Sequence, residues 1–223
     1  MKKIEKEKKV KKKKNVLNRL LLCILIVGVV LLGYFVYTNF FKKNNVVSAP
    51  KVVDEIKNFD YTVNENDTKL FKSTFNELKK VLSAKEVDKK AYAEYVSKLF
   101  VIDFFSLSNK TSKNDVGGVQ FVFSSYKSDF IDYARDGIYK QVNNAIDGNK
   151  NDSLPTVTKI NISKTDEVSP NAVFPNIDFG EGAVGYEVTL DWEYENGSGF
   201  QHSSTLTIVT DKEKLSVAKM TEE

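Results

Sequence analysis

The side chains that could carry out acid–base chemistry in this chain are few and lie far apart in the sequence. His202 is the only histidine, and it could act as an acid or a base near neutral pH. Asp103 lies in the phenylalanine-rich segment 100–105, where burial would raise the pKa of its carboxyl group. Three aromatic residues could line an apolar pocket around these groups: Tyr126, Tyr186 and Trp192. The five residues are therefore candidates for a site that binds or converts a small apolar ligand.

Each of these residues also has a structural explanation, which we favour. His202 would be a partly exposed strand residue near a turn, Asp103 would lie on the solvent side of a helix, and the aromatic residues would be ordinary core. A single histidine identifies neither a nucleophile's partners nor a zinc site, which needs several nitrogen or sulfur ligands. The sequence contains no phosphate-binding glycine loop, no Gly-x-Ser-x-Gly and no His-Glu-x-x-His. We therefore expect no catalytic residues, no metal and no cofactor.

A polar segment at residues 107–118 is flanked by aromatic-rich elements. Exposed loops of this kind often carry binding residues, so a partner could dock here. A plain solvated connection between two elements is the alternative.

The longest uncharged stretch runs from Leu20 to Phe41, directly after a lysine-rich tail at residues 1–19. About 20 apolar helical residues cross the roughly 30 Å hydrocarbon core of a bilayer, so residues 20–41 are predicted to be a transmembrane helix. The tail carries nine lysines and Arg19 against Glu5 and Glu7, a net charge of 10 − 2 = +8. Positive residues beside a span stay cytoplasmic, which predicts a single-pass protein with a cytoplasmic N-terminus and an extracytoplasmic C-terminal domain. Pro50 after the only plausible signal-peptidase site favours an uncleaved anchor.

The charge distribution also suggests partners. The whole chain has a net charge of +3, so residues 20–223 carry 3 − 8 = −5. The lysine-rich tail is expected to bind anionic lipid, although its lysines could serve only to set topology. No aromatic residues alternate with the lysines, and the acidic remainder offers no second basic surface, so we expect no nucleic-acid partner. Cys23 is the only cysteine, which leaves the C-terminal domain without a disulfide or a thiol nucleophile.

Hydrophobic periodicity divides the rest of the chain into a linker at residues 42–66 and an α+β domain at residues 67–223. Apolar residues recur every three or four positions and then every two, which predicts helices followed by strands. The expected helices cover residues 68–83, capped by Asp67, residues 89–106, capped by Asp88, and about 125–147. The expected strands cover residues 119–123, 156–163, 184–194, 200–210 and 215–220, with a polar loop at 164–182. Three helices on a curved, cone-like sheet of four antiparallel strands would result.

This order of elements resembles the nuclear transport factor 2-like (cystatin-like) superfamily, including the membrane-anchored assembly subunits of type IV secretion and conjugation machines. The resemblance covers about residues 67–220 and rests on element order alone. It implies a non-catalytic, membrane-anchored interaction or scaffold module of an envelope assembly, with envelope proteins as partners. The alternative is a small-ligand or enzymatic pocket lined by Tyr186, Trp192 and Phe130, with Asp103 or His202 reaching inward. Fold alone does not decide between them.

Overall fold

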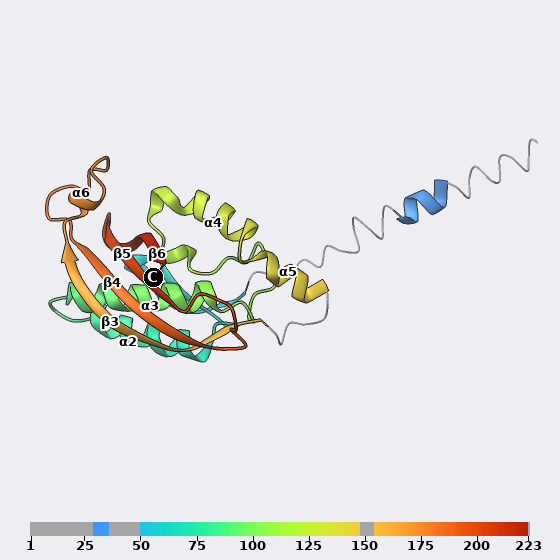
Figure 1. Cartoon of the computed structure of the whole chain (residues 1–223), viewed down its shortest axis with the longest axis horizontal. Helices are drawn as coiled ribbons and strands as arrows, with labels where there is room; N and C mark the ends of the chain where they lie inside the picture. Colours follow the sequence, from blue (N-terminus) through green and yellow to red (C-terminus); the bar gives the residue numbers. More distant parts are fainter. Residues whose placement is uncertain (1–28, 36–49, 148–153, 223) are drawn as a thin grey trace, which may run out of the picture. The chain divides into compact units, whose positions relative to one another are not determined.

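The computed structural model describes residues 29–35, 50–147 and 154–222, which belong to two units, Met1–Ser48 and Ala49–Glu223. The second unit is an α+β structure (Figure 1). Its strands are β1 (Val52–Ile56), β2 (Tyr61–Asn64), β3 (Thr156–Val168), β4 (Gly185–Glu195), β5 (Ser203–Asp211) and β6 (Lys214–Glu222). Its α-helices are α2 (Lys69–Leu82), α3 (Lys89–Phe105), α4 (Lys127–Asp136), α5 (Lys140–Asp147) and α6 (Pro170–Val173). Three short 3₁₀ helices complete the unit: η2 (Lys57–Phe59), η3 (Val119–Phe121) and η4 (Ser124–Tyr126).

The transmembrane helix predicted at residues 20–41 is not supported. Within the residues that the structure describes, no helix combines the length and the apolar character needed to cross a bilayer. Residues 29–35 of the predicted span are described, and they are helical. A helix of that length rises only about 10 Å, a third of the hydrocarbon thickness. The prediction of a single-pass membrane protein with an extracytoplasmic domain is therefore wrong for the described part of the chain. The remainder of the predicted span, and the lysine-rich tail at residues 1–19, lie outside the described residues.

The main sheet is a meander of four antiparallel strands in the order β3-β4-β5-β6, as the alternating pattern predicted. Along β4, the buried residues Val188 and Leu190 alternate with residues that face water, such as Asp191. Such a strand has one face on the core and one face toward solvent.

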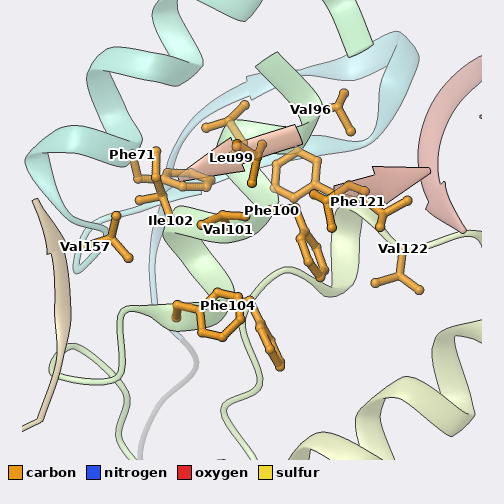
Figure 2. Close-up of a cluster of buried hydrophobic side chains, with 14 of the residues drawn as sticks. Phe71, Val96, Leu99, Phe100, Val101, Ile102, Phe104, Phe121, Val122 and Val157 are labelled. Carbon is orange, nitrogen blue, oxygen red and sulfur yellow. The ribbon is translucent and has the colours of Figure 1, made fainter. Parts of the chain in front are cut away.

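Helix α3 forms the centre of the core (Figure 2). Ten of its residues are buried, and they lie on all sides of the helix, because α2, the sheet and η3 surround it. Figure 2 shows Leu99, Phe100 and Ile102 of this helix beside Phe71 of α2 and Phe121 of η3. A helix that is apolar all round must be buried in this way.

One of the two predicted helix caps is wrong. Asp88 caps α3 by accepting a hydrogen bond from the Ala91 amide at 3.0 Å, as expected. The cap of α2 is Thr68, whose Oγ1 accepts from the Phe71 amide at 3.1 Å. Asp67, the predicted cap, instead accepts from the Asn64 amide at 2.7 Å.

Residues 52–64, part of the predicted linker, contain the antiparallel pair β1–β2. Tyr61 and Val63 of β2 are buried, so this pair belongs to the core. Strand β1 is mostly exposed, and its buried and exposed residues alternate only weakly, so its sequence did not distinguish it from a linker.

Two further elements differ from the prediction. Residues 119–121 form a 3₁₀ helix, not a strand, although Val122 makes an isolated parallel bridge with Val217 of β6. The third helix is divided into α4 and α5, because Gly137 takes a non-helical conformation (φ −103°, ψ −118°). Glycine is the residue least resistant to such a break.

Strand β3 is longer than predicted and shortens the polar loop before β4. It forms an edge of the main sheet over 13 residues. Its pairing with β4 shifts at two β-bulges, between Val157 and Lys159 and between Ile162 and Lys164. Lys159 also forms an ion pair with Glu193 across the two strands at 2.8 Å.

Candidate functional site

Asp103 is engaged by the segment that follows its own helix. One carboxylate oxygen contacts the Lys110 ammonium at 2.5 Å, and the other accepts a hydrogen bond from the Gly118 amide at 2.7 Å. The side chain of Asp103 is only 14% exposed and that of Lys110 only 5%. Burial lowers the pKa of Lys110, but the Asp103 carboxylate more than offsets this and raises the pKa above its usual value. Asp103 therefore serves to hold the loop as a buried ion pair.

The loop at residues 107–118 is ordered by such internal contacts. The Tyr139 hydroxyl accepts a hydrogen bond from the Gly117 amide at 2.8 Å and donates one to the Phe104 carbonyl at 2.9 Å. Within the loop, Asp115 accepts from the Thr111 amide at 3.0 Å. The loop is thus closed onto the end of α3 and is more than a solvated connection.

Asp67 adds a second carboxylate beside this ion pair, and its charge works against folding. Burial raises the pKa of Asp67 above its usual value of 3.8, and the Asp103 charge adds to the rise. Stability from such a group is complete below the unfolded pKa and is lost as the pH rises through the folded pKa. We therefore expect Asp67→Asn to increase the free energy of unfolding at pH 7, since an amide oxygen can still accept from the Asn64 amide.

Urea unfolding of the two chains at several pH values would test this expectation. The difference should shrink as the pH falls toward 3.8, where the native carboxyl group also becomes neutral. A variant that is less stable at pH 7 would contradict it.

The other candidate residues do not join Asp103. His202 is exposed, and its carbonyl accepts a hydrogen bond from the Trp192 amide at 2.9 Å. Tyr186 and Trp192 are buried in the core. Tyr126 is partly buried beside Phe123. No contact links the side chains of these candidates among the described interactions, and no described group of three or more His, Cys, Asp or Glu residues could hold a metal ion.

A different part of the molecule has the shape of a binding site. A groove of about 400 Å³ lies between Phe59, residues 82–92, residues 179–184 and the β5–β6 turn at residues 210–215. A depression of about 360 Å³ adjoins it and shares Phe59 and the turn. Lys127 and Ser124 lie on the far side of this depression. We call the two together the turn groove.

Two tyrosines fix the floor of the turn groove. The Tyr61 hydroxyl donates to the Leu215 carbonyl at 2.8 Å, and the Leu215 amide donates to the Tyr92 hydroxyl at 3.1 Å. The two hydroxyl oxygens lie 2.8 Å apart. Because Tyr61 has given its only proton to Leu215, Tyr92 donates to Tyr61. This closed ring joins β2, α3 and β6, and burial raises the pKa of both tyrosines.

Lys214 lies beside this ring. Its ammonium donates to the carbonyls of Phe59 and Gln120, each at 3.3 Å, and lies 5.0 Å from the centre of the Tyr61 ring. Burial lowers the pKa of Lys214, and the nearby charge of Lys127 lowers it further. The fixed position and reduced hydration suit the ammonium for contact with an anion.

Asp211 is the buried carboxylate of the turn groove, and it is already satisfied. Its two oxygens accept from the amide and the hydroxyl of Ser124, at 2.8 and 2.9 Å. Asp211 therefore fixes η4 against the β5–β6 turn.

No pattern in the sequence pointed to the turn groove. Residues 211–214 were only the short connection between the expected strands 200–210 and 215–220, and the groove's walls come from segments separated by many residues. A lysine next to a turn is normally exposed, and only the fold shows that Lys214 is partly buried.

Comparison of the chain with protein-family models, with curated proteins and with solved structures gives no significant match. The resemblance to the nuclear transport factor 2-like superfamily therefore stays a prediction, and function must be inferred from the geometry of the site.

Proposed function

We propose that this chain is a non-catalytic interaction module that binds its ligand in the turn groove. The observation that supports this is the groove itself, with an apolar floor of Phe59, Tyr92 and Leu215 beside the ammonium of Lys214. Clefts that combine an apolar lining with a few fixed polar groups are typical of ligand sites. The predicted envelope-protein partners, and anionic lipid for residues 1–19, stay predictions.

The alternative of a pocket inside the domain has less support. It needs open space around Trp192 and Phe130, but each of these rings contacts a phenylalanine of α3. The Trp192 ring lies 4.9 Å from the ring of Phe105, and the Phe130 ring lies 5.1 Å from that of Phe104. Asp103, the proposed acid or base, is paired with Lys110.

Titration of the ¹⁵N-labelled full chain with 2-naphthoate, followed by amide chemical shifts, would test the location of the site. We expect the shifts to concentrate at residues 210–215, Phe59 and Ala183. Ala183 lines the groove, so Ala183→Trp should fill part of it and weaken binding about tenfold, equivalent to about 1.4 kcal/mol.

Ala172→Trp supplies the matched control, because Ala172 is exposed on α6 and does not line the groove. Binding should be unchanged in this variant. Shifts centred on Trp192 and Phe130, or equal affinity in both tryptophan variants, would overturn the proposal.

A further inference from the structure

We infer that the ligand of the turn groove is an amphipathic anion, with an apolar body on the floor of the groove and an acidic group between Lys127 and Lys214. This inference rests on the proposed function and deepens it by naming the class of ligand. It follows from the way in which the charges of the groove are buried and paired.

Two lysines place partly buried positive charge in the turn groove. Lys127 and Lys214 are both partly buried, and both line the groove. Neither takes part in any of the ion pairs found among the described residues. Two partly buried ammonium groups without carboxylate partners are costly unless an anion joins them.

The carboxylates of the groove do not supply that anion. Asp211 is buried, and its charge acts on Lys214, but its oxygens accept from Ser124 and it forms no ion pair with either lysine. One buried carboxylate thus faces two partly buried ammonium groups. The remaining acidic residues, Asp60, Glu181 and Glu213, are exposed. Water solvates exposed charges well, so they compensate a partly buried ammonium only weakly. The part of the groove that is shielded from water therefore has an excess of positive charge.

Lys214 is also oriented to receive an anion. Its ammonium has three donors, and two of them go to the carbonyls of Phe59 and Gln120. One N–H remains for a ligand, and the two carbonyl contacts fix the position from which it donates. Burial and the Lys127 charge lower the pKa of Lys214 despite the opposing charges of Asp211 and Asp60, so the carboxylates present do not fully compensate the ammonium.

The neighbouring surface determines the rest of the ligand. Next to the lysines the groove is lined by eight apolar or aromatic side chains, the larger of which include Phe59, Leu82, Tyr92, Phe179 and Leu215. An inorganic anion would leave this surface wet, and a neutral apolar molecule would leave the lysines uncompensated. A carboxylate or phosphate carried on an apolar body satisfies both.

Three probes of one shape separate these contributions: 2-naphthoate, 2-naphthyl phosphate and the neutral 2-naphthylmethanol, each titrated into the full chain and followed by amide shifts. We expect at least one of the anions to bind tenfold or more tightly than the alcohol. The better anion distinguishes a carboxylate ligand from a phosphate ligand. Equal binding of all three at the groove would overturn the inference while leaving the proposed function intact, whereas no shifts at residues 210–215 with any probe would overturn both.

Lys127→Met and Lys214→Met should each weaken binding of the preferred anion about tenfold and leave the alcohol unaffected. Lys214→Met also removes the hydrogen bond to the Phe59 carbonyl. The Lys127 side chain makes no hydrogen bond among the described contacts, so Lys127→Met should keep the fold. The matched control is Lys159→Met, which removes a lysine of the sheet that is paired with Glu193.

A site-specific readout completes the test. The pKa of Lys214, followed by ¹³C NMR of the dimethylated amine, should rise when the anion binds and stay constant with the alcohol. Unchanged anion affinity in Lys127→Met, or a constant Lys214 pKa in the presence of saturating anion, would contradict the inference.

Discussion

Replacement of Lys110 by methionine is expected to lower the free energy of unfolding by about 3–5 kcal/mol. The reason is that the Asp103 carboxylate would lose its counter-charge in a site where its side chain is 14% exposed, with only the Gly118 amide left to bond it. Breaking a buried pair costs more than the pair itself contributes, because one charge is left alone. Urea unfolding followed by the fluorescence of Trp192 would measure the change.

Two further variants make this result specific. The double variant Lys110→Met with Asp103→Leu should recover part of the loss, since no unpaired charge remains. Lys80→Met removes a pair of similar length, 2.7 Å to Glu77, on the exposed face of α2, and should change stability far less than Lys110→Met does. If Lys110→Met and Lys80→Met had equal effects, the buried pair would not hold the loop.

Gly117→Ala is the second substitution with a large expected effect. A Cβ at this position would lie 2.1 Å from the main-chain carbonyl oxygen of Asp103, and neither main chain can give way cheaply. The loop would have to lift from α3, which breaks the hydrogen bonds from Gly117 to Tyr139 and from Gly118 to Asp103. Each buried group left unpaired costs about 1–3 kcal/mol, so a loss of about 3 kcal/mol is expected.

Gly180→Ala is the comparison for this variant. Gly180 has φ +79° but open space around its Cβ position, so alanine there should cost only the conformational penalty of about 1–2 kcal/mol. Thermal unfolding gives both values, and the amide shift of Gly118 shows whether the loop has lifted. A Gly117→Ala chain with the stability and the Gly118 shift of the native protein would contradict the close contact seen here.

The elements that could be predicted from the sequence are those whose burial follows a local period. Phe71, Phe75 and Leu78 recur on one face of α2, and the alternation along β4 is equally regular. Such patterns predict the type of element and its buried face, whatever its position in the fold. The predicted meander is confirmed for the same reason. The cap at Asp88 could be predicted because it depends only on residues next to the helix start.

The features that could not be predicted depend on contacts between distant segments. Tyr61 is buried, and its hydroxyl is hydrogen-bonded to Tyr92 and Leu215, 31 and 154 residues away, so the place of β2 in the core depends on distant segments. Residues 119–123 have the composition of a strand, but η3 packs on α3 and leaves only Val122 to pair with the sheet. Local propensity is a weak guide where tertiary contacts decide the conformation.

The contacts of the candidate site could not be predicted from the sequence either. The sequence identified Asp103 as unusual but offered only a ligand pocket or a solvated helix face to explain it. The partner, Lys110, is seven residues further along the chain, and their contact requires the loop to turn back onto α3. The turn groove is lined by five segments that are far apart in the sequence, which is why no motif pointed to it.

The two bulges of β3 affect how this molecule can meet copies of itself. A flat outer strand of 13 residues would be a template for intermolecular sheet growth. Each bulge interrupts the regular spacing of amide and carbonyl groups, and a lysine follows at each interruption. A second strand therefore finds no long, regular ladder to extend, which makes this edge of the sheet a poorer template for aggregation.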